Sequence, residues 1–385
     1  MAQPNIAGVV DPAFARVREV FAANFAEDAA FREIGAAVAV HAGGRPVVDL
    51  WGGVADPATG RAWTPDTLVN VWSTTKGVMA IALAQLVDSG ALDYDAPVAR
   101  YWPEFAQAGK GEITVAQVLS HQSGLNGFAA PTTLEDFGDW ETVTGRLAAQ
   151  APFWPPGTAT SYHAMTYGFL AGEIARRITG LSPRALVASA IAGPLDADLQ
   201  IGATHGDWPR IAPLTPPAPA QAGGPAPHAW ALHGVMNPAL KGEDANSPGW
   251  RMAQIPAGNG HATARALSRL YGAVGNGGTI DGCRLLSPGV IDAMRAPRST
   301  RDDLLLGPGA WAAGFMINRG GLFGPGEGAF GHCGWGGSYA YADPDPDLGL
   351  GVGYTPNRMF GSILQDPRGV ALAHAIAECA GRAGA

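Results

Sequence analysis

A serine and a lysine one helical turn apart are the residues best suited to chemistry in this chain. They are Ser73 and Lys76, in the stretch VWSTTKG over 71–77. At this spacing both side chains share one face of a first helical turn, where free N–H groups and the helix dipole favour an alkoxide. The pattern predicts a nucleophilic serine beside a proton-accepting lysine. The alternative is a serine that caps the helix and a lysine that reaches solvent.

The residues after Lys76 favour the first interpretation. From 77 to 87 the sequence GVMAIALAQLV is apolar on nearly every side of a helical wheel, and Gly90 is a plausible end of the helix. We therefore expect a helix over 73–89 that is buried all round. A lysine that starts in such a core is desolvated, so its pKa falls and it can accept a proton. An S-x-x-K pattern also arises by chance, and the rest of the sequence must supply the context.

Tyr162 is the second candidate, at the end of a turn with the sequence WPPGTATSY over 154–162. It directly precedes a helix expected over 163–179, a place from which a phenol can point into a cleft. Near a cationic lysine its pKa is expected to fall toward a value useful to a general base. The alternative is an aromatic side chain that only packs the turn.

The third candidate is the glycine-rich stretch FGHCGWGGS over 330–338, which contains His332, Gly334, Trp335 and Gly336. Small residues let a strand edge approach a ligand closely, and a backbone N–H on such an edge suits an oxyanion hole. The alternative is a hairpin corner. His332 has two possible roles at this stage, to assist the base near neutral pH or to hold the strand edge. Cys333 is expected to face the core.

The elements around these motifs indicate an α/β fold with one sheet formed from both ends of the chain. Two strands, 36–41 and 46–51, are joined by the glycine pair at 43 and 44, and a helical pattern precedes them within 11–30. Further strands are expected at 311–318, 337–342 and 349–354, before a last helix at 367–380. Other helices are expected at 114–120, 182–190 and 262–275.

We therefore predict a mainly antiparallel sheet from residues 1–72 and 300–385, flanked by terminal helices, with a mainly helical domain inserted over 73–299. The active site is expected at the junction of the two parts. The segment 203–258 is rich in proline, alanine and glycine, a composition that opposes helices and strands. Because it also carries Trp208, Trp230 and Trp250, we expect an ordered lid or pocket wall rather than a flexible linker.

Composition excludes several classes of protein. The chain has 385 residues, of which 47% are hydrophobic and 15% charged, and a formal net charge of −8. These values are typical of a globular protein and argue against nucleic acid or an anionic membrane as a partner. Since no signal peptide or membrane-spanning run is visible, a cytoplasmic location is expected. The three cysteines are too scattered for disulfides or a zinc site, no cofactor is implied, and no oligomeric state is specified.

The order S-x-x-K, then a tyrosine after Pro-Gly, then H-x-G-x-G-G resembles the serine β-lactamase and penicillin-binding-protein superfamily. More narrowly, it is similar to the class C β-lactamase-like carboxylesterases called family VIII. The segments 92–105, 113–125 and 256–278 also look like this family, and 203–255 matches least. The resemblance implies the family's antiparallel sheet with an inserted helical domain. It also implies Ser73 as the nucleophile and Tyr162 as the principal base, which returns the proton to the leaving alcohol. Lys76 would either help to remove the Ser73 proton or hold Tyr162 as a phenolate. The backbone N–H groups of Ser73 and Trp335 would form the oxyanion hole.

Two departures from the class C pattern bear on the substrate. Ala164 stands where those β-lactamases have an asparagine, and His332 stands where they have a lysine that attracts a substrate carboxylate. Both favour a neutral ester over a lactam. We therefore predict a serine carboxylesterase for small-molecule esters of short-chain or modest size, acting through an acyl-enzyme on Ser73. The alternatives are an acyltransferase, an amidase or peptidase, a weak β-lactamase and, less favoured, a non-catalytic binding protein.

Overall fold

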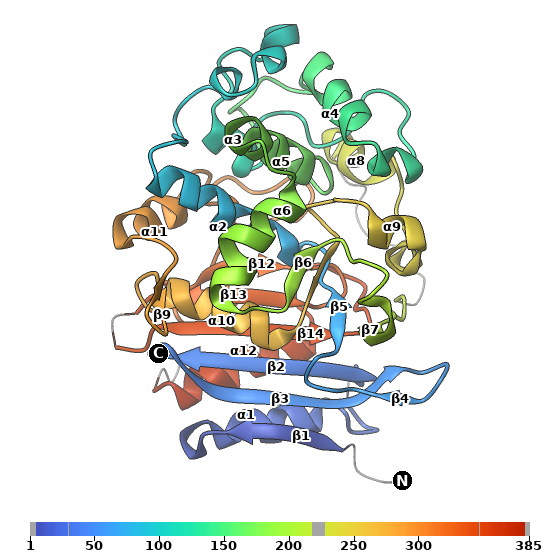
Figure 1. The fold of residues 1–385 in the computed structure, drawn as a ribbon, viewed down its shortest axis with the longest axis vertical. Helices are drawn as coiled ribbons and strands as arrows, with labels where there is room; N and C mark the ends of the chain where they lie inside the picture. Colours follow the sequence, from blue (N-terminus) through green and yellow to red (C-terminus); the bar gives the residue numbers. More distant parts are fainter. Residues whose placement is uncertain (1–4, 30, 218–227, 346, 382–385) are drawn as a thin grey trace.

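An antiparallel sheet built from the two ends of the chain forms the base of the molecule (Figure 1). The computed structural model describes residues 5–29, 31–217, 228–345 and 347–381. The strand order is β1-β3-β2-β14-β13-β12-β11, and β4 also pairs with β3. The strands are β1 (Ile6–Val10), β2 (Gly35–Ala42), β3 (Arg45–Asp56), β4 (Arg61–Ala62), β11 (Met316–Ile317), β12 (Phe330–Cys333), β13 (Tyr339–Asp343) and β14 (Leu350–Pro356).

The N-terminal and C-terminal parts of the sheet join where β2 pairs with β14, with Val38 opposite Tyr354. The predicted hairpin of β2 and β3 is confirmed. The strand expected over 311–318 is reduced to two residues, because the chain turns back at Gly314, whose φ is +89°. β1 was not predicted, since Gly8 interrupts its pattern, yet Gly8 lies so close to β3 that only glycine fits.

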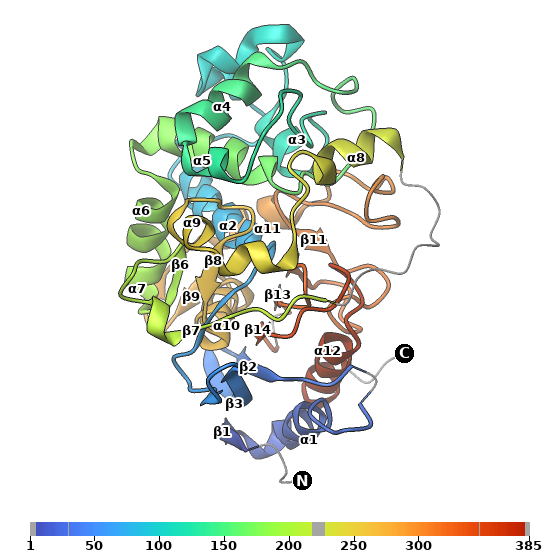
Figure 2. The same ribbon diagram turned by 90° about the vertical axis from the view of Figure 1, so that its right-hand side faces the viewer.

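Helices cover both faces of the sheet (Figures 1 and 2). The terminal helices α1 (Ala15–Ala23) and α12 (Pro367–Cys379) pack together and share an apolar cluster with β2 and β3. On the other face, α10 (Ala264–Gly275) packs against β14 and β2. A Cβ atom on Gly351 would lie 1.9 Å from the Gly272 nitrogen, which shows how closely helix and strand approach. Helix α10, which covers the sheet, therefore comes from the segment 73–299 that the sequence predicted as an inserted domain. The division into two domains stays a prediction.

Most other helices lie beyond α10 and surround α2 (Thr74–Asp88), which is buried from Thr74 to Ala84 as the sequence predicted. The longest of them, α5 (Thr166–Thr179), packs against α2 and ends at Gly180 with a φ of +71°. Other helices of this region are α3 (Val115–Leu119), α4 (Trp140–Ala149), α6 (Pro183–Val187), α7 (Gly193–Leu195) and α11 (Pro288–Arg295). Two small sheets complete the region, formed by β5 (Leu68–Asn70), β6 (Leu199–Ile201), β7 (Ile211–Ala212), β8 (Gly260–Ala262), β9 (Thr279–Ile280) and β10 (Cys283–Arg284).

The proline-rich segment 203–258 contains more regular structure than its composition predicted. It forms α8 (Ala229–Met236) and α9 (Pro248–Met252), although residues 218–227 lie outside the described part of the chain. The expectation that the composition opposes helices was wrong here, because α8 contains no proline and Pro248 occupies the first turn of α9, where no N–H is needed. In the described part, Trp230 stacks on Trp154 with ring centroids 5.5 Å apart. No helix among the described residues is long and apolar enough to cross a membrane.

Candidate active site

Ser73 and Lys76 lie in contact at the start of α2, as their spacing predicted. Ser73 occupies the N-cap position but makes no side-chain capping bond, and Lys76 is completely buried. The Lys76 Nζ atom lies 2.9 Å from the Ser73 Oγ atom. It also lies 2.7 Å from the carbonyl oxygen of Ala164 and 2.9 Å from that of Ala257. The alternative of a capping serine and a solvent-reaching lysine therefore does not fit the structure.

Burial lowers the pKa of Lys76 well below its ordinary value of 10.5, and no carboxylate of the described residues pairs with it. A neutral amine has two N–H donors and one lone pair. In this form the two carbonyl oxygens take the two donors and the lone pair faces the Ser73 hydroxyl, whereas a protonated Lys76 donates its third hydrogen to the Ser73 oxygen. Neutral Lys76 can therefore take the proton of Ser73 directly.

Side-chain hydroxyl groups form hydrogen bonds with the backbone on either side of Ser73 and hold it in place. Trp72, the residue before it, has a φ of +44°, a conformation that side-chain-bearing residues rarely adopt. The Thr75 hydroxyl donates to the Trp72 carbonyl at 2.5 Å and accepts from the Gly260 N–H at 2.9 Å. The Ser338 hydroxyl donates to the Val71 carbonyl at 2.8 Å. These bonds stabilise the strained turn that presents Ser73.

Tyr162 lies beside the pair, and its ring centroid is 4.8 Å from the Lys76 Nζ atom. Burial raises the pKa of Tyr162 above its ordinary value of 10.0, and the neighbouring Ser73 hydroxyl offsets only part of the rise. The phenol makes no hydrogen bond of regular geometry with the described residues. The expected fall in its pKa is not seen, because the burial of the phenol itself raises the pKa. Tyr162 is therefore a neutral phenol that can donate a proton.

The glycine-rich stretch brings Trp335 to the same place. No backbone acceptor among the described residues takes a hydrogen bond from the N–H groups of Ser73 or Trp335, which leaves both free for an oxyanion. A Cβ atom on Gly334 would lie 2.3 Å from both the Val71 carbonyl oxygen and the Ser338 Oγ atom. Only a glycine at position 334 lets the glycine-rich stretch lie this close to the turn that precedes Ser73.

Gly336 fixes the other side of Trp335. Its φ of +98° favours glycine, and a Cβ atom there would lie 2.8 Å from the Met359 Cγ atom. The Gly336 carbonyl accepts a hydrogen bond from buried Arg368 on α12 at 3.3 Å. The C-terminal helix thus helps to hold the turn that carries the Trp335 N–H.

His332 is buried beside this turn, and its Nδ1–H group donates to the Cys333 carbonyl at 2.7 Å. Burial, and then the charge of Lys76 when it is protonated, lower the pKa of His332 to about 3. His332 is therefore neutral near pH 7, which does not fit a role as a base that titrates there. Cys333 is buried as predicted.

A cavity of about 350 Å³ opens at Ser73. Within the described part of the chain its lining includes no charged side chain and consists of Trp72, Ser73, Tyr162, Ala164, Met165, Gly234, Val235, Pro238, Leu240, Leu305, Leu306, Trp335, Gly361, Ser362 and Ile363. Residues 234–240 belong to the segment that the sequence predicted as a lid or wall, and they form one wall of the cavity. His332 is not part of the lining.

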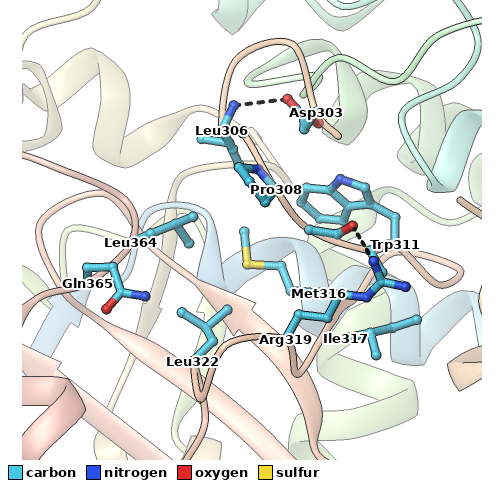
Figure 3. Close-up of a pocket in the computed structure, with 13 residues that line it drawn as sticks. Asp303, Leu306, Pro308, Trp311, Met316, Ile317, Arg319, Leu322, Leu364 and Gln365 are labelled. Carbon is cyan, nitrogen blue, oxygen red and sulfur yellow. Dashed lines mark hydrogen bonds between the residues drawn. The ribbon is translucent and has the colours of Figure 1, made fainter. Parts of the chain in front are cut away.

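The loop that carries Asp303, Leu305 and Leu306 was not predicted to belong to the site. Leu306 separates the main cavity from a smaller one, shown in Figure 3, which Trp311 and Met316 also line. The only signal in the sequence is three consecutive leucines after Asp303, at 304–306. Nothing local relates this run to Tyr162, from which it is far in sequence.

Comparisons with known proteins identify the family and the fold. The model of the beta-lactamase family matches residues 21–375. The esterase/beta-lactamase LipL of Mycobacterium tuberculosis is 39% identical over 347 residues, covering 87% of this chain and 79% of its own. A crystal structure of a family VIII carboxylesterase is 42% identical with a TM-score of 0.91, covering 97% of this chain and 100% of the other. A penicillin-binding protein homologue from Caulobacter crescentus is 43% identical, with the same TM-score and coverage.

The chain belongs to the beta-lactamase family, and its fold is that of β-lactamases and penicillin-binding proteins. Within that family it is a serine hydrolase similar to the family VIII carboxylesterases, as the three sequence motifs indicated. The names of the relatives include an esterase, a β-lactamase and a penicillin-binding protein. These names differ in substrate, so the cavity of this chain is what bears on its own substrate.

Proposed function

We propose that the protein hydrolyses neutral carboxylic esters of short-chain or modest size through an acyl-enzyme on Ser73. The observation that carries this proposal is that none of the described residues lining the cavity at Ser73 has a charged side chain. A site without a fixed cation offers nothing to hold a substrate carboxylate, whereas an apolar lining suits the hydrocarbon parts of an ester.

In the proposed reaction, the Ser73 oxygen attacks the carbonyl carbon while Lys76 accepts its proton. The N–H groups of Ser73 and Trp335 stabilise the oxyanion that forms. Tyr162 gives its proton to the leaving alkoxide as the ester bond breaks, and the proton held by Lys76 restores the phenol. Water then attacks the acyl-enzyme by the reverse proton path and releases the acid. In this scheme Lys76 acts as the first base, a role that the family resemblance gave to Tyr162, because burial lowers the pKa of the lysine.

The test compares p-nitrophenyl esters of graded acyl length with a chromogenic cephalosporin, using the wild type and Ser73→Ala. Ser89→Ala is the matched control, because Ser89 is exposed at the other end of α2. We expect rapid ester turnover that Ser73→Ala abolishes and Ser89→Ala preserves, with little cephalosporin cleavage. Unchanged ester turnover in Ser73→Ala would refute the nucleophile. Cephalosporin turnover comparable to that of the best ester would instead favour a β-lactamase.

A further inference from the structure

We infer that Asp303 is a positioning residue that holds Tyr162 in place to protonate the leaving group, an inference that rests on the proposed function. Asp303 is only 4% exposed and makes no ion pair with any cation of the described residues. Its Oδ1 atom accepts hydrogen bonds from the backbone N–H groups of Tyr162 at 3.1 Å, Leu305 at 2.9 Å and Leu306 at 3.1 Å. Figure 3 shows the bond to Leu306.

A single oxygen atom thus joins two segments that are far apart in sequence. The backbone contacts of the same loop reinforce the junction. Asp303 and Gly307 exchange two hydrogen bonds of 2.8 Å, which close the loop, and the Leu304 N–H donates to the Thr160 carbonyl at 2.9 Å. A buried carboxylate without a cation is costly. The three backbone N–H groups that donate to the Oδ1 atom offset this cost for Asp303. A purely apolar loop would not need such a residue.

The ring of Tyr162 is held from the same loop. The indole of Trp311 stacks on it with ring centroids 5.6 Å apart and planes 19° from parallel. The Trp311 side chain also faces Asp303 and helps to lower its pKa against the rise that burial causes. The contact between Trp311 and Asp303 is not a hydrogen bond of regular geometry, and the second carboxylate oxygen, Oδ2, has no such bond. Asp303 therefore bonds the backbone of Tyr162 and contacts the residue that orients its ring.

Asp303 also accepts hydrogen bonds from the N–H groups of Leu305 and Leu306. Both leucines line the cavity at Ser73. The carboxylate consequently fixes the distance between one cavity wall and the phenol. Small displacements of a reacting group lower rates strongly, on the order of 100-fold for about 1 Å. Loss of Asp303 is therefore expected to impair the proton transfer from Tyr162 more than the binding of substrate.

The experiment measures kcat/KM, which reports acylation, for the ethyl ester and the p-nitrophenyl ester of the same acid. An ethoxide must be protonated as it leaves, whereas p-nitrophenolate leaves without a proton. We expect Asp303→Ala to lower kcat/KM for the ethyl ester roughly 10- to 100-fold more than for the p-nitrophenyl ester. Asp303→Asn, which keeps an accepting oxygen, should lie between Asp303→Ala and the wild type. Asp302→Asn, an equal charge change at the exposed neighbour, is the control and should keep the wild-type ratio.

The ratio of the two rates does not depend on how much protein is folded, so an unstable variant still gives an answer. A ratio equal to that of Asp302→Asn in both Asp303 variants would refute the positioning role and leave Asp303 as a structural residue. Titration of Ser73 with a phosphonate ester tests the proposed function separately. A wild type that neither turns over esters nor reacts with the phosphonate would overturn the esterase, which is a different result from an unchanged ratio.

Discussion

Replacement of Lys76 by methionine tests whether the lysine is neutral in the folded protein. The substitution keeps an unbranched side chain of similar length and removes the amine. Two carbonyl oxygens, those of Ala164 and Ala257, lose their partner, which costs about 1–3 kcal/mol each if they remain buried and unpaired. An opposite effect on stability depends on pH, because a lysine whose pKa is lower in the folded than in the unfolded state releases protons on folding between those two pKa values.

The sign of that effect follows from the pKa of Lys76, which is below 10.5 in the folded state and near 10.5 in the unfolded state. Between these two values the unfolded chain binds more protons. The free energy of unfolding of the wild type therefore rises with pH in this window, by up to about 1.4 kcal/mol per pH unit from this group alone. The variant lacks this contribution. The stability of the wild type relative to Lys76→Met should consequently grow as the pH rises toward 10.5.

The assay is urea unfolding of both proteins at a series of pH values from neutral toward 10.5. Lys241→Met, at an exposed position, serves as the control for loss of a lysine and should show no such trend. A difference between wild type and Lys76→Met that stays constant with pH would show that Lys76 folds with its proton and would refute its role as first base. Ester hydrolysis by Lys76→Met should also fall by about 10²- to 10⁴-fold, the usual contribution of a general base.

Three further predictions concern the groups around Ser73. Tyr162→Phe should lower kcat/KM for an alkyl ester by about 10²- to 10⁴-fold and for the p-nitrophenyl ester much less, as paired assays of the two esters would show. Gly334→Ala places a Cβ atom 2.3 Å from the Val71 carbonyl and should displace the Trp335 N–H. A loss of about 10²- to 10³-fold in kcat is expected, and a normal kcat would exclude that N–H from the oxyanion hole. Because the pKa of His332 is about 3, His332→Asn should leave the midpoint of the acid limb of the pH–rate profile unchanged. A shifted midpoint would assign that limb to His332.

Local sequence patterns predicted the parts of the site that lie within one segment. The S-x-x-K spacing depends only on helix geometry, and the apolar run after it was enough to predict that Lys76 is buried. The glycines at 334 and 336 indicated a close approach, which Val71 and Met359 make in the structure. These features need no knowledge of distant contacts.

The features that the sequence did not predict depend on contacts between distant segments. Asp303 acts on Tyr162, 141 residues away in the chain, through a backbone N–H that every residue except proline has. The pKa of Tyr162 was expected to fall because a cation was expected nearby. Burial, which is a property of the assembled core, raises it instead. Helix α8 was missed because composition alone does not show that prolines lie outside a helix rather than within it.

The pairing of β2 with β14 has a consequence for how the chain is synthesised. β2 is synthesised long before its second neighbour β14, because Tyr354 lies far beyond its partner Val38 along the chain. Until then β2 presents an open edge whose N–H and C=O groups can pair with another chain. Contacts of such long sequence separation also slow folding. Nascent chains of this protein should therefore depend on chaperones, and fragments that stop before Leu350 should aggregate even though they contain Ser73, Lys76 and Tyr162.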